Sequence, residues 1–553
     1  MKMDRNSILV LTWLSAAIAP LSLATATGPE ERTFEITRQY LHLPIAQEGD
    51  RQRMRLYSNG EVIRQFDISL TETPDFWVAS DVSKWHGQEI TLRLGGEPNS
   101  GMHLIRQDDE MPGADRMYNE KHRPQFHFTS RRGWLNDPNG LVYYDGEWHL
   151  FYQHNPYEWR WGNMHWGHAI STDLFHWEEQ GNVFHPFGED TRGAAFSGSG
   201  LVDHDNTAGW RTGDEDVIVA AFTDTGSGEV IAYSNDRGRS FTLYEGNPVI
   251  EHNGRDPKII WHEPTERWVL AVYEHLDDKQ WISFYTAPDL KDWTFQSRIE
   301  GFYECPDLFE LPIDGDESDT RWVLYAADAR YMIGHFDGEE FTPEHEGKHQ
   351  VWHGNYYAAQ TYDNAPDGRR VQIGWARGVT FPGMPFNQQM AVPVELTLRS
   401  TDVGPRMFAE PVKELANIRN RGHRFDAMQL APGDANPAED ILAELLEVDV
   451  TFEPGDSGRL VFNIRGVLVT YHAESGEVEC AGTRVPLEPV DGQVRLQILV
   501  DRGSVECFGN GGRVAISQKT QPALDSRHVH VRAENTPVEI HELNVHELKS
   551  IWQ

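Results

Sequence analysis

The chain has 553 residues, of which 86 are Asp or Glu and 49 are Lys or Arg, so its formal net charge is −37. Such a negative chain is not suited to nucleic acid or anionic membranes as partners, but it is compatible with a neutral ligand. A hydrophobic content of 39% and an aromatic content of 11% are sufficient for packed cores, which excludes a disordered or fibrous chain.

The first residues have the pattern of a secretory signal peptide. A short basic start precedes a largely apolar run from Ile8 to Leu23, and Ala24-Thr25-Ala26 forms a small-x-small cleavage site. We expect residues 1–26 to be removed and the mature chain to be secreted or periplasmic, with no membrane contact after cleavage. The alternative is an N-terminal membrane anchor, for which the apolar run is short.

Residues 30–106 are predicted to form a small β-domain. Apolar and polar positions alternate in segments such as 33–37 and 61–66, which is the pattern of half-buried strands. The pair Asn59-Gly60 is a turn signal between two of these strands. A polar stretch from Gln107 to Glu120 then links this domain to the rest of the chain.

Residues 118–420 contain a weak repeat in which a small, polar turn is followed by an aromatic residue. The aromatic residues of four such segments are Trp177, Phe241, Trp293 and Phe341, which lie 64, 52 and 48 residues apart. Units of about 50 residues that hold several short strands are typical of propeller blades, and this region has room for five. On the repeat alone, the alternative is an irregular β-sandwich.

The C-terminal part again has the pattern of strands. Residues 410–421 have the apolar spacing of a short helix, and residues 424–553 return to alternation, as in 459–464 and 495–500. We interpret this last part as a β-sandwich. The predicted fold is therefore all-β, with a five-bladed β-propeller, a C-terminal β-sandwich and a small N-terminal β-domain.

The three cysteines are too few for a disulfide framework in an exported chain of this length. Cys305 has the character of a small buried residue. Cys480 and Cys507 fall in one predicted domain, and whether they pair is left open.

Three short segments of the propeller region place a carboxylate in a constrained setting. They are Trp134–Gly140, Arg255-Asp256-Pro257 and Glu304-Cys305-Pro306-Asp307. In the first two a proline follows the aspartate, which disfavours a helical conformation and stiffens the chain. Asp-Pro pairs also occur in ordinary turns, so any one segment alone is weak evidence of a site.

Cleavage of a glycosidic bond needs two carboxyl groups, one at the anomeric carbon and one that protonates the leaving oxygen. Glu304 has the longer side chain and suits the proton donor, whose pKa must be raised by burial or neighbouring carboxylates. Asp137 suits a rigid nucleophile. Asp256, next to Arg255, suits a fixed anion that binds sugar hydroxyls. Aromatic rings near these segments can pack against sugar faces, although most are expected to be core.

Taken together, the segments resemble glycoside hydrolase family 32, which comprises invertases, levanases and inulinases. The order and spacing of the matching segments also agree with the family, and the resemblance extends from about Tyr118 to the C-terminus. The matching segments are Trp134–Gly140, Phe196-Ser197-Gly198-Ser199, Arg255-Asp256-Pro257, Glu304-Cys305-Pro306, Gly374-Trp375 and Pro411-Val412-Lys413-Glu414-Leu415.

The resemblance implies a five-bladed propeller, a β-sandwich, and retention of configuration through a fructosyl-enzyme intermediate. It makes Asp137 the nucleophile, Asp256 the transition-state stabiliser and Glu304 the acid/base. It also implies a set of residues that line the fructose pocket: Asn136, Gln153, Trp161, Phe196, Ser197, Arg255 and Trp375.

Two features refine this expectation. The segment from Ala376 to Gln389 departs from the usual forms of the family. The resemblance therefore gives least support to the assignment of Trp375, which directly precedes this segment, to the pocket. The N-terminal β-domain, with Pro74-Asp75-Phe76-Trp77-Val78, resembles an accessory domain found ahead of bacterial levanase-like enzymes, which favours fructan over sucrose alone.

We therefore expect a carbohydrate-active enzyme that releases fructose from levan or inulin, and whether it also acts on sucrose is left open. The alternatives are an invertase or a fructosyltransferase on the same scaffold, and a non-catalytic fructan-binding protein. Linkage preference, endo or exo action and oligomeric state are left open. No cofactor or metal is expected, because His149, His154, His165 and His168 lack a strong ligand spacing.

Overall fold

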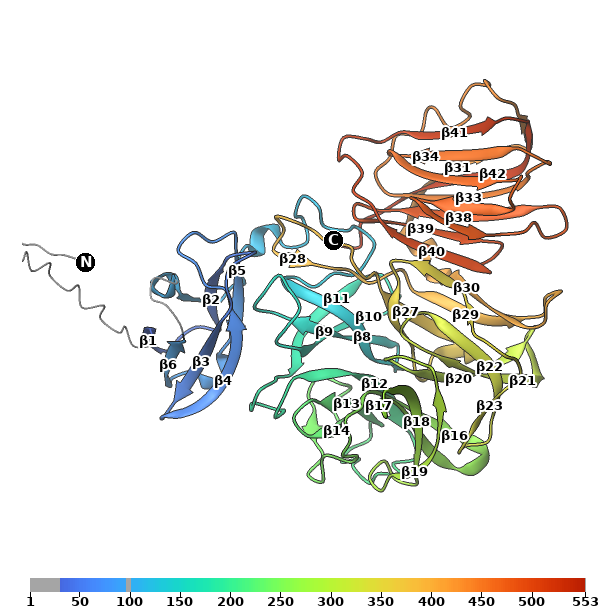
Figure 1. The fold of residues 1–553 in the computed structure, drawn as a ribbon. Coiled ribbons are helices and arrows are strands. Elements are labelled where there is room, and N and C mark those ends of the chain that lie inside the picture. The colour runs from blue at the N-terminus through green and yellow to red at the C-terminus, as the bar shows by residue number, and fades with distance from the viewer. Residues whose placement is uncertain (1–29, 96–100, 553) are drawn as a thin grey trace, which may run out of the picture.

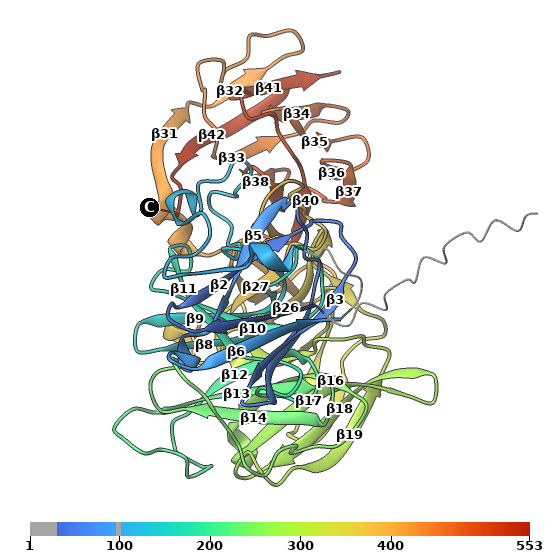
Figure 2. The ribbon, with the colours of Figure 1, turned by 90° about the vertical axis from the view of Figure 1, so that its left-hand side faces the viewer.

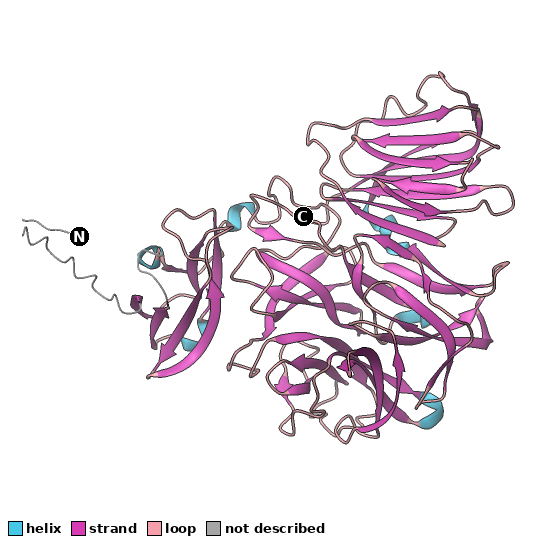
Figure 3. Cartoon of the chain, viewed as in Figure 1, coloured by secondary structure: helices cyan, strands magenta, loops and turns pink. Residues whose placement is uncertain are grey.

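The computed structural model describes residues 30–95 and 101–552, which form mainly β-strands (Figures 1 and 3). The predicted signal peptide lies outside the described residues. Within those two ranges, no helix is long and apolar enough to cross a membrane. The helices are short 3-10 turns: η1 (Ser83–Trp85), η2 (Met102–Leu104), η3 (Ala114–Arg116), η4 (Glu263–Thr265), η5 (Pro366–Gly368) and η6 (Lys413–Ile418).

The N-terminal domain consists of two small antiparallel sheets around one apolar core. Asn59 and Gly60 both have positive φ values, of 51° and 86°, as a two-residue hairpin turn between β3 and β4 requires. The sheets contain β1 (Glu30–Glu35), β6 (Glu89–Leu94), β3 (Gln52–Ser58) and β4 (Glu61–Ile68) in one, and β5 (Phe76–Asp81), β2 (Tyr40–Ile45) and β7 (Arg106–Asp108) in the other.

The middle of the chain forms a five-bladed β-propeller, as predicted. In chain order the blades are β8 (Gly133–Tyr144) to β11, β12 (Ala195–Asp203) to β15, β16 (Arg255–His262) to β19, β20 (Asp307–Ile313) to β23, and the set β26, β27, β29 and β30. The other strands are β9 (Glu147–Asn155), β10 (His165–Ser171), β11 (Trp177–Phe184), β13 (Val217–Asp224), β14 (Gly228–Ser234), β15 (Thr242–Leu243), β17 (Arg267–Leu276), β18 (Lys279–Ala287), β19 (Thr294–Glu300), β21 (Asp316–Tyr325), β22 (Arg330–Phe336), β23 (Phe341–Pro343), β24 (His349–Gln350), β26 (Tyr357–Thr361), β27 (Val371–Trp375), β28 (Phe386–Asn387), β29 (Val394–Arg399) and β30 (Arg406–Pro411).

The repeated aromatic residues mark the fourth strand of each of the first four blades. Trp177 and Phe341 begin β11 and β23, while Phe241 and Trp293 immediately precede β15 and β19. The turn and aromatic residue recur because each blade returns to its outer edge at this point.

The C-terminal β-sandwich packs directly on the propeller (Figure 1). Its larger sheet begins with β25 (Trp352–Gly354), which leaves the propeller region and pairs in parallel with β40. Trp352 is 1% exposed, stacks on Tyr356 at 3.8 Å and meets Phe508 edge-on. The larger sheet continues with β40 (Val514–Lys519), β39 (Ser504–Gly509), β38 (Val494–Val500), β33 (Leu446–Glu453), β42 (Val538–Leu548), β31 (Arg419–Phe425) and β32 (Met428–Leu430), and the smaller sheet is β37 (Thr483–Pro486), β36 (Glu477–Cys480), β35 (Val467–His472), β34 (Arg459–Ile464) and β41 (Val529–Glu534).

The helix expected over residues 410–421 is shorter than predicted. Only Lys413–Ile418 is helical, as a 3-10 turn, and strands β30 and β31 occupy the rest of the segment. Val412, Leu415 and Ile418 are buried at a spacing of three, which fits a 3-10 helix of three residues per turn. Cys480 and Cys507 are both free and buried in the sandwich core.

Candidate active site

The innermost strands of the first three blades each carry part of the predicted site. Asn136 and Asp137 lie in β8, Phe196 and Ser197 in β12, and Asp256 in β16 after Arg255. At these positions the pairing of each strand with its neighbour slips in register. Such bulges redirect side chains, so the same irregularity in three blades turns these groups toward one pocket.

The backbone at two of the three acidic residues, and at Cys305, has positive φ values that are unusual for residues with side chains. Asp256, Glu304 and Cys305 have φ values of 67°, 52° and 39°. Residues other than glycine are strained at positive φ values, and such strain persists only where the surrounding structure holds the backbone in place. Glu304 and Cys305 lie in the turn just before β20, so the fourth blade also contributes from the start of its inner strand.

The pocket has a volume of about 390 Å³, within the range of small-ligand sites. All ten residues predicted for the site line this pocket. Three further residues line it that the sequence reasoning missed: Tyr303, Tyr357 and Arg377. Tyr357 begins β26, the inner strand of the fifth blade, so the position of an aromatic residue at an inner-strand start is the signal that could have found it.

Asp137 and Asp256 are held in fixed orientations. Ser197 Oγ donates a hydrogen bond to Asp137 Oδ2 at 2.7 Å. The backbone N–H of Cys305 donates to Asp256 Oδ2 at 3.1 Å, and the Cys305 thiol lies 3.5 Å from the same oxygen. That sulfur is also 4.0 Å from Asp137 Oδ2, so both carboxylates contact the same atom.

Glu304 is held by one cation and one hydroxyl. Arg255 Nη2 donates to Glu304 Oε1 at 2.6 Å, and Tyr357 Oη donates to Oε2 at 2.8 Å. The side chain of Glu304 is 22% exposed, whereas that of Asp256 is 5% exposed. Of these two carboxyl groups, Glu304 is therefore the one that can exchange a proton with solvent.

Burial and the neighbouring carboxylates disfavour ionisation of the two aspartates. Burial raises the pKa of Asp137 above its usual value, although Asn136 and Ser197 oppose the rise. Burial, followed by the charge of Asp137, raises the pKa of Asp256 to about 7. Burial and the nearby carboxylates also raise the pKa of the Cys305 thiol, which therefore remains neutral.

Aromatic side chains form the walls of the pocket. Trp161 is 51% exposed and meets Phe196 edge-on, with ring centroids 6.1 Å apart. Trp375 Nε1 donates to Gln388 Oε1 at 3.0 Å, so the divergent segment after Trp375 folds back and holds the indole. The guanidinium of Arg377 lies over the ring of Tyr357 at 4.5 Å.

The four histidines discussed above are buried in blade 1, and burial lowers the pKa of each. His149 Nδ1 lies 3.1 Å from His168 Nε2, and His154 bonds to the carbonyl of Arg132 at 2.9 Å. Among the residues that the structure describes, no group of three or more His, Cys, Asp or Glu is placed to hold a metal ion.

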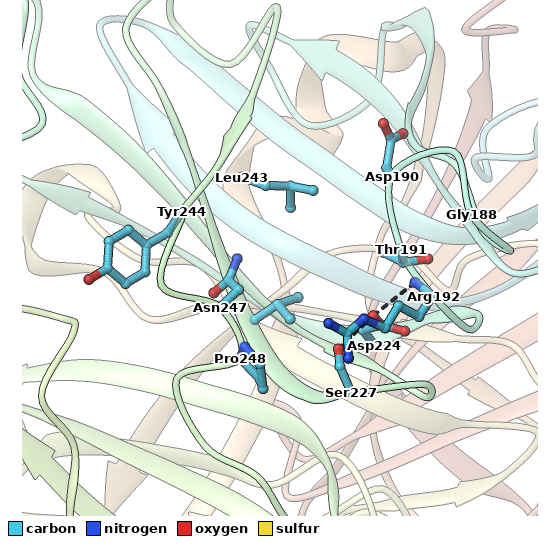
Figure 4. A pocket seen from close by; sticks show the side chains of 11 residues that line it. Gly188, Asp190, Thr191, Arg192, Asp224, Ser227, Leu243, Tyr244, Asn247 and Pro248 are labelled. Carbon is cyan, nitrogen blue, oxygen red and sulfur yellow. Dashed lines mark hydrogen bonds between the residues drawn. The ribbon is translucent and has the colours of Figure 1, made fainter. Parts of the chain in front are cut away.

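A second hollow, of about 250 Å³, lies beside blade 2 (Figure 4). Asp190 and Asp224 both line it, and Asp224 accepts hydrogen bonds from the backbone N–H groups of Arg192 and Gly193, at 3.0 and 2.7 Å, and from Ser227. These donors, with that of Gly226, lower the pKa of Asp224 against the effect of burial. Asp224 therefore fixes the loop and is not poised for proton transfer.

Comparison with known proteins identifies related sequences. The model of the glycosyl hydrolases family 32 N-terminal domain matches residues 127–411, and the C-terminal model of the same family matches residues 414–547. A levanase from Bacillus subtilis (strain 168) is 36% identical over 491 residues, covering 79% of this chain and 72% of that protein. The extracellular exo-inulinase inuE of Aspergillus ficuum is 30% identical over 518 residues, covering 79% and 96% respectively.

Solved structures agree with these matches. The exo-inulinase from Aspergillus awamori has a TM-score of 0.71 at 28% identity and covers 79% of this chain and all of its own. The beta-fructofuranosidase from Schwanniomyces occidentalis, complexed with fructosyl-erythritol, has a TM-score of 0.69 at 25% identity and covers 78% and 99%.

Proposed function

The chain belongs to glycosyl hydrolase family 32 and is a glycosidase that hydrolyses fructosides, and on that premise we propose that it releases fructose from a β-fructan, levan or inulin. Sucrose is the further candidate substrate on the same scaffold. The predicted signal peptide and the extracellular relatives support secretion as part of this proposal. The pocket is compatible with a neutral sugar, because Arg255 pairs with Glu304 and lies 3.8 Å from Asp256, which offsets part of the negative charge.

In the proposed reaction, Glu304 protonates the leaving oxygen while Asp137 attacks the anomeric carbon of the fructosyl unit. The fructosyl-enzyme intermediate is then hydrolysed by a water molecule that Glu304 activates, and configuration is retained. Ser197 occupies one oxygen of Asp137 and so orients the carboxylate. Asp256 binds sugar hydroxyls from a position fixed by the Cys305 backbone.

The observation that carries the proposal is the convergence of three acidic side chains, from three different blades, on one pocket. Retention further requires that the carboxyl groups of Asp137 and Glu304 lie about 5–5.5 Å apart when substrate is bound. This separation stays a prediction, and the anomeric form of the first product, followed by NMR, tests it.

The test of the roles uses Asp137→Ala and Glu304→Ala. Each variant should fold and lose fructose release on the order of a thousandfold or more, because neither chemical step can proceed without its carboxyl group. Asp292→Asn, at an exposed position of blade 3, is the matched control and should keep normal activity. Near-normal release from either alanine variant contradicts the assignment.

Time courses on levan, inulin and sucrose test the substrate. Fructose as the sole product from the earliest times indicates exo action, and early oligosaccharides indicate endo action. Products larger than the substrate at high sucrose concentration would reveal transfer to a sugar instead of water. Absence of any reducing sugar with all three substrates would contradict an enzymatic function.

A further inference from the structure

The N-terminal domain lies against blade 1, close to the active-site pocket. The matched family regions begin at residue 127, so this domain precedes them. Figures 1 and 2 both place its sheets beside β8–β10. One set of its contacts joins residues 187–189 through Arg64, Gln65 and Lys84. Another set joins the loop between β9 and β10, residues 156–164, which carries Trp161 of the pocket.

The loop is anchored inside the N-terminal domain. Tyr157 is 2% exposed and belongs to the apolar core of that domain, where it stacks on Phe66 with ring centroids 3.7 Å apart. Tyr157 Oη also lies 3.3 Å from Ser80 Oγ. The start of a pocket loop is therefore part of the core of another domain.

The other end of the loop is paired with strand β4. Asn163 Oδ1 accepts from the backbone N–H of Asp67 at 2.8 Å, and its Nδ2 donates to the carbonyl of Asp67 at 2.8 Å. Asn163 and Gly162 have φ values of 43° and 145°. The side-chain amide thus extends the sheet of the N-terminal domain by one pair of hydrogen bonds and fixes this irregular turn.

Between these anchors, a cluster of charged groups holds Trp161 itself. Arg51 of the N-terminal domain donates to the carbonyl oxygen of Trp161 at 2.7 Å. Glu158, whose side chain is 0% exposed, lies 3.6 Å from Arg51 and 3.3 Å from Arg160. Arg160 in turn donates to the carbonyl of Gly49 at 2.7 Å. A β-carbon on Gly162 would lie 2.9 Å from the Arg51 guanidinium, so this glycine leaves room for it.

The same domain also reaches the second pocket loop. Gln47 Oε1 accepts from the backbone N–H of Gly383 at 3.2 Å, in the segment that folds back onto Trp375. Trp159 joins the two loops, because its indole N–H donates to the carbonyl of Phe386 at 3.1 Å and its carbonyl accepts from Asn387 at 3.1 Å.

From these contacts we propose that the N-terminal domain is a positioning element of the active site, which holds Trp161 at the pocket mouth through Arg51 and thereby sets the affinity for the fructoside. Arg51 does not line the pocket, so it acts through the loop. The choice of a fructoside as the ligand rests on the proposed function, whereas the contacts that hold Trp161 do not depend on it.

The test is a double-mutant cycle on KM. Arg51→Ala should raise KM for an inulin oligosaccharide by about tenfold, as loss of one charged hydrogen bond would, while kcat changes by less than about twofold. Arg51→Lys should restore part of the affinity. In a Trp161→Ala background, Arg51→Ala should add little, because its effect passes through that side chain. Arg55→Ala is the control, since its guanidinium bonds to Gln65 within the N-terminal domain.

Unchanged KM in Arg51→Ala, or additive effects in the cycle, would overturn the inference while leaving the proposed function intact. An equal rise in KM in Arg55→Ala would also overturn it, because it would indicate general loosening of the domain. If the wild-type protein released no fructose, the proposed function would fail. Calorimetric binding of the same oligosaccharide to the same variants would then decide the inference, and absent binding or unchanged affinity would overturn it.

Discussion

Removal of His127 should abolish a pH-dependent contribution to the free energy of unfolding, which comes from the interface between the propeller and the β-sandwich. His127 lies just before blade 1, and its Nδ1 and Nε2 are 2.9 Å from Asp501 and 3.3 Å from Glu506, both in the sandwich. All three side chains are 0% exposed. Burial lowers the pKa of His127, but the two carboxylates outweigh this effect and raise it to about 9.

The size of the effect follows from linkage. A rise from 6.5 to about 9 corresponds to about 3 kcal/mol, because each unit of pKa is about 1.4 kcal/mol. Since the folded-state pKa is the higher one, this stabilisation is complete below about pH 6.5. It is then lost as the pH rises through 9, where the imidazolium loses its proton in the folded protein as well.

Urea unfolding of the wild type and of His127→Gln, at intervals from pH 6 to pH 10, measures this contribution. The free energy of unfolding should differ between the two proteins by about 3 kcal/mol more at pH 6 than at pH 10. His103→Gln, at an exposed position of the N-terminal domain, is the control and should follow the wild type. Parallel curves for wild type and His127→Gln would refute a charged His127 at this interface.

Three further predictions concern single groups. Tyr357→Phe removes a donor from Glu304 Oε2 and should lower kcat/KM on sucrose by about tenfold; an unchanged value would mean that this bond does not assist the reaction. Ser197→Ala removes a hydrogen bond that favours the ionised form of Asp137. The pKa of Asp137 should therefore rise, and the acidic limb of the pH–rate profile should move to higher pH. An unmoved limb would argue against Asp137 as the ionised nucleophile. Cys480 and Cys507 are free, so a thiol assay on unfolded, unreduced protein should find three thiols per chain, and a value of one would reveal a disulfide.

The propeller could be predicted from the sequence because its first four blades repeat a turn and an aromatic residue at one structural position, the start of the fourth strand. The fifth blade lacked such a marker: its strands are interrupted by the segment around β28, and its outer strand is Arg406–Pro411. The pocket residue Tyr357 of the fifth blade was also missed. Only its place at the start of an inner strand distinguishes it from the aromatic residues of the core.

The short apolar segment near Lys413 illustrates the limit of local patterns. Spacings of three and four both fit a few apolar residues, so the sequence could not distinguish a 3-10 turn from an α-helix. The strands on either side, β30 and β31, are formed by pairing with β29 and β42, and such distant partners leave no mark in the local sequence. The contacts of Arg51 with the pocket loop were likewise invisible, because they join residues about 110 positions apart.

The crossing of β25 into the C-terminal sheet has a practical consequence for engineering. Three residues from the propeller region form the edge of that sheet and cover one side of β40. A fragment cut after Pro411 would keep an unpaired strand, and the complementary fragment would expose an open sheet edge, which favours aggregation. The C-terminal β-sandwich therefore cannot be exchanged as a cassette, and chimaeras with related enzymes should transfer the propeller and the sandwich as one unit.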